Sequence, residues 1–395
     1  MLLSDVAPGY DRGKEFWGGM RQRRGNNHLR RPSFRFCGVA IAALLCVGLG
    51  LLTGCASLLW GVPRADFSFA PGFAYPHVSI TFDASACVSE KDEIAQYAWQ
   101  FGDGLIGTGK VVSHTYVSLG YFTVTLTITT EHGQEASAQR TIHVAGAIVV
   151  PVDYTTIQKA INAASDGDTI VVLAGSYREN INFLGKAISV QSTDPSDATV
   201  VAATIIEGAD NSDYSVVTFG NSETSASMLT GFTIRRRSLY QPFSGGGIYV
   251  READPTIRSN HIVNNTAYFA GGGIYLVESR ATIVGNRIAN NSTTQGGGIA
   301  AEGYALFPTI SDNEFEGNSA SGGGAIHLSS IVPGQEPEGA LPTTLTNNTF
   351  NANAATQWGG AAVYVDYDCK LKLDNPDSNT YSNNDPDDIF YVVPP

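Results

Sequence analysis

Two carboxylates, Glu302 and Asp366, occupy equivalent positions in related segments of this 395-residue chain. If each segment forms one turn of a stack of strands, the two side chains lie two turns, or roughly 9–10 Å, apart. That separation suits the acid and the base of an inverting glycoside hydrolase, which leave room for a water between them. A solvated acidic face is the simpler interpretation, so both residues are only candidate catalytic groups.

The position two residues before each of these acids forms a column that is mostly aromatic. In "GGGIYVRE" (245–252), strand alternation places Ile248 and Val250 inward and therefore Tyr249 and Arg251 outward. The successive members of the column are Tyr249, Tyr275, Ala300, His327 and Tyr364, and beside them run Arg251, Val277, Glu302, Ser329 and Asp366. Rings one strand apart suit stacking on sugar rings, so the candidate ligand-binding residues are Tyr249, Tyr275, His327, Tyr364 and Arg251. The alternative is that tyrosines stack on one another, as is common on exposed sheet faces.

Motifs for other chemistries are missing from the sequence. No H-E-x-x-H, C-x-x-C or G-x-S-x-G motif occurs. The segment "GDGLIGTGK" (102–110) has phosphate-loop spacing, but "VVSHTY" follows it with a strand pattern. A phosphate loop needs a helix N-terminus at that point, so we interpret these glycines as turn residues. The sequence predicts no metal site.

Runs of small residues divide the C-terminal part of the chain into repeats. They stand at 245–247, 271–273, 296–298, 323–325 and 360–362. Pairs of asparagines recur between them: Asn260 and Asn265, Asn286 and Asn291, Asn313 and Asn318, Asn348 and Asn353. Such short repeats cannot bury a core alone, so neighbouring repeats must stack. Strand-length apolar runs without a helical period predict a parallel β-helix over residues 147–395.

The glycines and asparagines have structural roles in such a stack. Each turn must bend sharply at the same place, where stacked backbones come close and only small residues fit. Stacked asparagines can form amide ladders that satisfy the backbone groups of the turns. The amphipathic segment 155–164 is expected to form a short helix that caps the open N-terminal end.

Residues 147–395 resemble right-handed parallel β-helix proteins of the pectin-lyase type. The segments "FEGN" (315–318), "FNAN" (350–353) and "GGAIHL" (323–328) are also similar to the F-x-x-N and G-G-A-[ILV] repeats of polymorphic outer-membrane proteins. The resemblance implies the fold and a surface role. The motifs of polygalacturonases and the arginine-centred motif of pectate lyases are missing, so it does not imply an activity.

Residues 65–146 show short alternating strands that predict an immunoglobulin-like β-sandwich. The segment "WQFGDG" (99–104) resembles the signature of the polycystic kidney disease (PKD) domain, and "SHTY" and "TVTLTIT" resemble strands that follow it. The fold class is therefore all-β. The segment "SEKDEI" (89–94) stands where family members usually carry an Asp/Gly-rich turn, so calcium has no support and no cofactor is predicted.

The N-terminus reads as an export signal. A cluster of arginines precedes an apolar run, 37–52, that ends in "LLTGC" and resembles the bacterial lipobox with Cys55 as the lipidated residue. Residues 1–54 would then be removed, and 55–64 would form a linker. An uncleaved membrane helix is the alternative, since apolar residues continue through "ASLLWGV" (56–62) and the combined span is long enough to cross a bilayer. Either Met1 or Met20 is the start.

The net charge limits the classes of partner that the exported chain can bind. The sequence has 24 basic and 37 acidic residues, and removal of residues 1–54 leaves 16 and 34, a net charge of −18. Such a surface repels nucleic acid, so we expect no nucleic-acid partner and membrane attachment only through the lipid. We expect a monomer at the cell surface that binds carbohydrate or another surface partner without catalysis. The alternative is a polysaccharide lyase or glycoside hydrolase.

Overall fold

The structure is a computed structural model. It describes residues 62–210, 212–236, 241–303, 308–329, 343–366, 371–372 and 378–391. The predicted signal segment and Cys55 lie outside these residues. Within the described ranges, no helix is long and apolar enough to cross a membrane.

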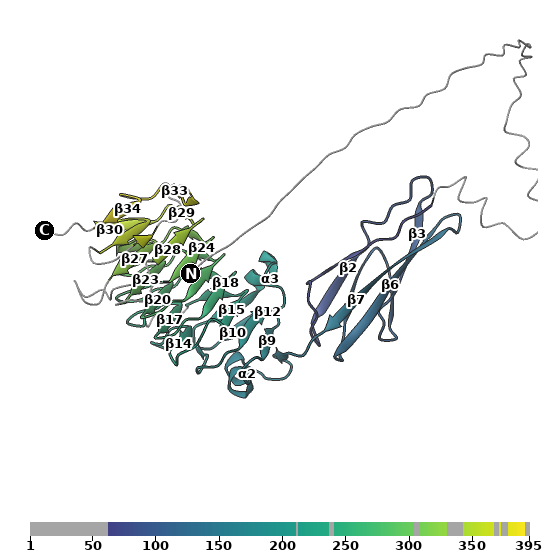
Figure 1. Cartoon of the computed structure of the whole chain (residues 1–395), viewed down its shortest axis with the longest axis horizontal. Coiled ribbons are helices and arrows are strands. Elements are labelled where there is room, and N and C mark those ends of the chain that lie inside the picture. The colour runs from purple at the N-terminus through teal and green to yellow at the C-terminus, as the bar shows by residue number, and fades with distance from the viewer. Residues whose placement is uncertain are drawn as a thin grey trace, which may run out of the picture. The chain divides into compact units, whose positions relative to one another are not determined.

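The first domain is a sandwich of two antiparallel sheets (Figure 1). One sheet contains β1 (Ser68–Ala70), β2 (Ser79–Asp83) and β5 (Val111–Thr115). The other contains β4 (Ile106–Thr108), β3 (Ile94–Gln100), β6 (Gly120–Thr130) and β7 (Glu135–Val144). The 102–110 segment supplies β4 and leads into β5, so no helix follows it. Gly102, Gly104 and Gly109 have positive φ in the loops beside β4, whereas Gly107 lies within that strand.

The core of the sandwich is aromatic. Trp99 lies edge-on to Phe67 with ring centroids 5.1 Å apart, and its indole nitrogen donates to the carbonyl oxygen of Gly109 at 2.9 Å. Along β6 the predicted alternation is present, because Val124, Leu126 and Ile128 are fully buried while Thr125 and Thr127 between them are only half-buried. Aromatic burial with satisfied polar tips accounts for the stability of such a small core.

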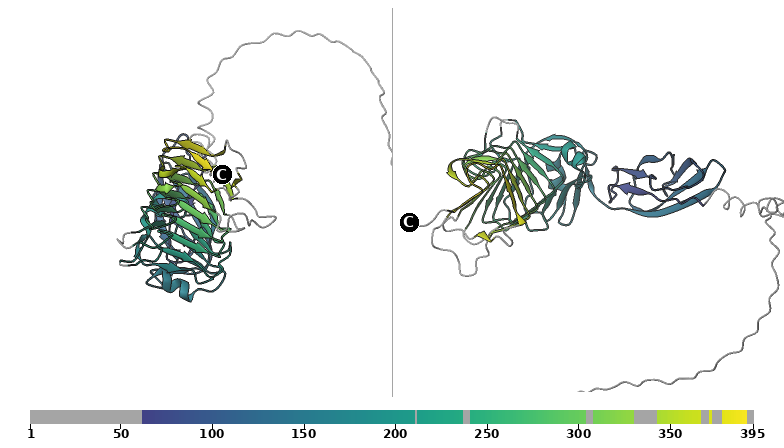
Figure 2. Two further views of the ribbon diagram at one scale, coloured as in Figure 1. Left: turned by 90° about the vertical axis from the view of Figure 1, so that its left-hand side faces the viewer. Right: turned by 90° about the horizontal axis from the view of Figure 1, so that it is seen from above.

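The second domain is a parallel β-helix with three sheets, seen from two further directions in Figure 2. We call the first the groove sheet: β11 (Ile181–Asn182), β14 (Val217–Phe219), β17 (Ile248–Arg251), β20 (Ile274–Val277), β23 (Ile299–Glu302), β27 (Ile326–Ser329), β31 (Val363–Val365) and β34 (Ile389–Tyr391). All of its strand pairs are parallel, as the repeats predict.

The other two sheets complete each turn of the helix. The second sheet contains β8 (Ile148–Val150), β9 (Thr169–Val172), β12 (Ser189–Ser192), β15 (Met228–Thr230), β18 (Thr256–Arg258), β21 (Thr282–Val284), β24 (Thr309–Ser311), β28 (Thr343–Thr346) and β32 (Leu371–Lys372). The third contains β10 (Gly175–Arg178), β13 (Thr204–Glu207), β16 (Thr233–Arg235), β19 (His261–Val263), β22 (Arg287–Ala289), β25 (Glu314–Glu316), β29 (Thr349–Asn351) and β33 (Thr380–Ser382). A short extra pair joins β26 (Ser319–Gly322) to β30 (Ala354–Gly359).

Two short helices flank the first turns. The predicted cap is α2 (Ile157–Ala163), which buries Ile157, Ala160 and Ile161 against the first strands. Its first amide groups, at Ile157 and Gln158, donate to the carboxylate of Glu179 at 2.9 and 2.8 Å. The second helix, α3 (Ala198–Ala203), was not anticipated. Its N-cap, Asp197, accepts from the amide of Thr199.

The glycine runs at equivalent positions of successive turns stack into a column, where the backbones come as close as the repeats predict. A Cβ on Gly246 would lie 2.3 Å from the carbonyl oxygen of Gly272 and 2.5 Å from that of Thr266. Gly245 has a φ of +70°, a conformation that disfavours other residues. The column therefore combines a left-handed turn with a close approach of stacked backbones.

The asparagines form two buried ladders, also as predicted. The backbone amide of Asn265 donates to the side-chain oxygen of Asn291 at 2.9 Å, and its side-chain amide donates to the same oxygen at 3.1 Å. That side-chain amide also donates to the carbonyl oxygen of Ile234 at 3.0 Å. The same pattern links Asn260 to Asn286. Each ladder thereby satisfies buried backbone groups at one corner of the turns from Asn260 and Asn265 onward.

Candidate binding groove

The strand register aligns the residues of the predicted column on successive strands. Tyr249 pairs with Tyr275, which pairs with Ala300, and the column continues through His327 to Tyr364. The ring centroids of Tyr249 and Tyr275 are 5.8 Å apart, with an interplanar angle of 47°. The two rings therefore present neighbouring, differently tilted faces.

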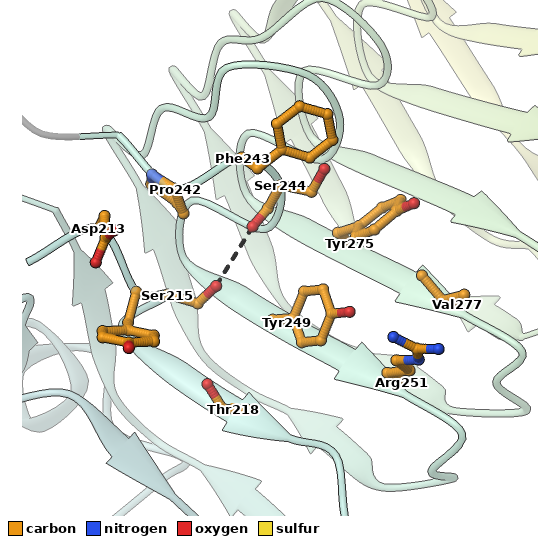
Figure 3. A pocket seen from close by; sticks show the side chains of 11 residues that line it. Asp213, Ser215, Thr218, Pro242, Phe243, Ser244, Tyr249, Arg251, Tyr275 and Val277 are labelled. Atoms are coloured by element: carbon orange, nitrogen blue, oxygen red, sulfur yellow. Dashed lines mark hydrogen bonds between the residues drawn. The ribbon is translucent and has the colours of Figure 1, made fainter.

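A groove of about 540 Å³ lies over the first part of this column. Tyr249, Arg251 and Tyr275 rise from adjacent strands of its floor, and Phe243 lies on the loop beside them (Figure 3). The wall next to Phe243 includes Asp213 and Tyr214, since the Ser215 hydroxyl of this segment donates to the carbonyl oxygen of Ser244 (Figure 3). Three of the candidate ligand-binding residues thus share one concave surface.

Two exposed aromatic side chains at the groove were missed by the sequence argument. Phe243 is 68% exposed and Tyr214 is 73% exposed. Phe243 stacks on Phe269 with ring centroids 5.3 Å apart, which limits its freedom. The one available signal was the position of Phe243 just before the glycine run at 245–247. Large exposed rings beside a groove are typical of ligand-binding sites.

The wall at 212–215 is held by hydrogen bonds to its backbone. Arg236, which is buried, donates to the carbonyl oxygens of Tyr214 and Ser212. Asn180 donates to the carbonyl oxygens of Tyr214 and Ser215 at 3.1 and 2.7 Å. The wall is therefore fixed to the third sheet and to the loop before β11, so its shape is set before a ligand arrives.

Arg251 is tied to its neighbours. Its Nε donates to the carboxylate of Glu252 at 3.1 Å. Hydrogen bonds to Glu252 and Tyr249 raise the pKa of Arg251. The guanidinium is thus an exposed cation at the edge of the groove, with a carboxylate beside it that partly compensates its charge.

Tyr275 connects the groove to Glu302 on the next strand. Its hydroxyl donates to the Glu302 carboxylate across the diagonal of the two strands. Burial and this hydrogen bond raise the pKa of Tyr275, so the hydroxyl keeps its proton at neutral pH. The predicted acid Glu302 therefore acts as an acceptor for a tyrosine at the border of the groove.

The expectation that His327 lies on an exposed face is wrong. Its side chain is buried and stacks on Tyr364, with ring centroids 4.8 Å apart. Tyr364 in turn stacks on Phe390 at 5.5 Å. Ala300 is also buried, so the column is divided into the groove at Tyr249 and Tyr275 and a separate stack at the C-terminal turns. Packing between successive aromatic rings explains the burial of His327.

The two candidate catalytic acids have different surroundings. Asp366 Oδ2 lies 3.5 Å from Nε2 of His327, which is within ion-pair range but long for a hydrogen bond. Glu302 accepts from Tyr275, and Ser329 occupies the strand position next to it. Neither acid is among the residues that line the groove. Each acid thus contacts a different partner, and the two do not share one site.

In the described part of the chain, no group of three or more His, Cys, Asp or Glu side chains is placed to hold a metal ion.

The comparisons with known families agree with this architecture. Residues 169–385 match the family model of the right-handed β-helix region, and residues 63–145 match that of the PKD domain. The chain belongs to the right-handed β-helix family, with a PKD domain before the helix. No protein of curated function matches the sequence.

Three solved structures are similar to parts of this chain. A structure of carbohydrate-binding modules from the β-sandwich superfamily is 34% identical over 22% of this chain and 36% of its own, with a TM-score of 0.22. The PKD1 domain of a Vibrio cholerae metalloprotease is 27% identical over 22% of this chain and 99% of its own, with a TM-score of 0.20. A pectin methylesterase in complex with a hexasaccharide is 13% identical over 63% of this chain and 93% of its own, with a TM-score of 0.37. This chain thus spans about a third of the first of these structures.

Proposed function

We propose that this protein binds carbohydrate in the groove of its β-helix without cleaving it. The observation that carries the proposal is the pairing of Tyr249 and Tyr275, one strand apart on the floor of a concave surface of about 540 Å³. Strand spacing of ~4.8 Å lets successive rings contact successive sugar units. Sugar rings have apolar C–H faces that stack on aromatic side chains, while polar groups at the edges bind hydroxyls.

The rim of the groove supports the same proposal. Phe243 and Tyr214 are exposed on neighbouring loops, and both loops are held by contacts: Phe243 stacks on Phe269, and Arg236 binds the Tyr214 backbone. A pre-ordered site loses less entropy on binding than one that must fold around its ligand. The groove thus suits a ligand that is gripped by rigid aromatic surfaces.

Cleavage is not part of the proposal. Hydrolysis by inversion needs an acid and a base that flank the same bond. Glu302 accepts a hydrogen bond from Tyr275 and Asp366 lies beside the buried His327, so each carboxylate is engaged in a different contact.

We also propose export and attachment to the membrane through a lipid on Cys55, which the lipobox-like "LLTGC" supports.

A glycan array tests the proposed function. We expect the full chain to bind at least one class of oligosaccharide, and the double variant Tyr249→Ala with Tyr275→Ala to lose at least about tenfold in affinity. Tyr154→Ala, an exposed tyrosine before α2 and far from the groove in sequence, is the control and should bind normally. Binding that survives the double variant would place the ligand elsewhere and contradict the proposal.

A further inference from the structure

We infer that the groove selects neutral sugars that donate hydroxyl hydrogen bonds and discriminates against uronate polymers. This inference rests on the proposed function, since it assigns the class of glycan that the same groove takes. Three features of the described groove support it: the direction of the Tyr275 hydrogen bond, the position of Glu302, and the partial neutralisation of the Arg251 charge by nearby carboxylates.

The hydroxyl of Tyr275 has only one proton, and it is donated to Glu302. The phenol oxygen therefore offers lone pairs, and no proton, to a ligand in the groove. A sugar hydroxyl can donate to those lone pairs. A ligand carboxylate is an acceptor without a proton, so it finds no partner at Tyr275.

Glu302 places a negative charge next to the groove floor. Val277 lines the groove, and Glu302 is its direct neighbour on the adjacent strand. The charge stays at this place because Tyr275 holds the carboxylate. A polymer with a carboxylate on every sugar meets this charge wherever its chain continues past Tyr275, and like charges repel.

The cation at the groove does not reverse this preference. Arg251 is the one Lys or Arg among the described residues that line the groove. Its Nε is committed to Glu252 at 3.1 Å, and Asp213 contributes an opposite charge to the wall. Recognition of a carboxylate by arginine relies on two parallel N–H donors, and the contact with Glu252 takes one face of that fork. The described lining thus lacks a net positive charge to attract a polyanion.

The sharpest comparison uses ligands that differ only in charge. Isothermal titration of the full chain at low ionic strength would compare hexagalacturonate with its methyl ester, together with cellohexaose, xylohexaose and mannohexaose. We expect at least one neutral ligand to bind, and the methyl ester to bind at least about tenfold tighter than the free acid. High salt should reduce this ratio, because screening weakens the repulsion. Tighter binding of the free acid would overturn this inference and leave the proposed function intact. Absence of binding to every ligand, the array-selected ones included, would contradict both.

Two variants assign the discrimination to Glu302. Glu302→Gln keeps the size of the side chain and removes the charge, so it should strengthen binding of the free acid at least about threefold and change binding of the neutral ligand by less than about twofold. Glu314→Gln, an acid on the third sheet, is the matched control and should leave the ratio unchanged. Tyr275→Phe keeps the ring but removes the acceptor, and should weaken neutral ligands several-fold. If Glu302→Gln is folded by circular dichroism and the ratio of the affinities for the methyl ester and the free acid is unchanged, the role of Glu302 is overturned.

Discussion

The guanidinium of Arg236 donates to the backbone carbonyl oxygen of Tyr214 at 2.6 Å, so a buried cation fixes one wall of the binding groove. Asn180 binds the same carbonyl oxygen at 3.1 Å. The wall therefore depends on two side chains, Arg236 and Asn180, that are not among the residues lining the groove. Such contacts shape a site by restraining its backbone rather than by adding contacts to the ligand.

Replacement of Arg236 by methionine should loosen this wall. Arg236→Met keeps an apolar stem but removes the guanidinium donors to the carbonyl oxygens of Ser212 and Tyr214, and a hydrogen bond from a charged group contributes about 1.5–3 kcal/mol. Faster hydrogen exchange in the 212–217 segment and a several-fold loss of glycan affinity are the expected results. Arg258→Met, on the second sheet, serves as the control. Unchanged exchange at the wall would show that Arg236 does not hold it.

The asparagine ladder should contribute strongly to stability. Asn291→Ala removes the acceptor of the Asn265 backbone amide, which donates to it at 2.9 Å, and the donor to the carbonyl oxygen of Ile262. Leaving these buried groups unpaired should lower the free energy of unfolding by at least about 2 kcal/mol. Urea denaturation measures the change. The neighbouring exposed Asn290, with a φ of +54°, provides the control Asn290→Gly, which should be nearly neutral. Equal effects of the two variants would contradict a special role for the ladder.

The repeats allowed the fold and the register to be predicted because stacked turns constrain the same residue types at each step. The glycines at 245–247 and the ladder at Asn265 follow directly from this constraint. The burial of His327 could not be predicted, since it depends on how tightly the Tyr364 ring packs over it. The wall at 212–215 was also missed, because it precedes the first glycine run at 245–247 and carries none of the glycine or asparagine signals from which the register was derived.

Acid should destabilise the β-helix in part through His261. Burial and the nearby charge of Arg287 lower the pKa of His261, while Glu314 partly offsets them. The folded state therefore binds a proton less readily than the unfolded chain, whose histidine pKa is about 6.5. The stability that comes from a neutral His261 is present above pH 6.5. It is lost as the pH falls towards the lower pKa that His261 has in the folded state.

The thermal midpoint should accordingly fall more between pH 7.5 and pH 5 in the native protein than in His261→Asn. His143→Asn, in the sandwich domain, should retain the pH dependence of the β-helix. A His261→Asn protein with the full pH dependence of the native chain would contradict this assignment.

The proposed lipid anchor makes a prediction about location. Cys55→Ala removes the thiol that would carry the lipid, so the chain should move from the membrane fraction to the soluble fraction after expression in a bacterium that processes lipoproteins. Cys87→Ala, a free thiol in the sandwich domain, is the control and should leave the distribution unchanged. Retention of Cys55→Ala in the membrane would favour an uncleaved membrane helix in place of the lipid anchor.

A crystal structure of the chain with an oligosaccharide selected by the array is the most direct test of the central claim. The account predicts sugar rings over Tyr249 and Tyr275, with Phe243 at the edge, and intact glycosidic bonds after prolonged incubation. An oligosaccharide bound elsewhere, or cleaved products between Glu302 and Asp366, would contradict it.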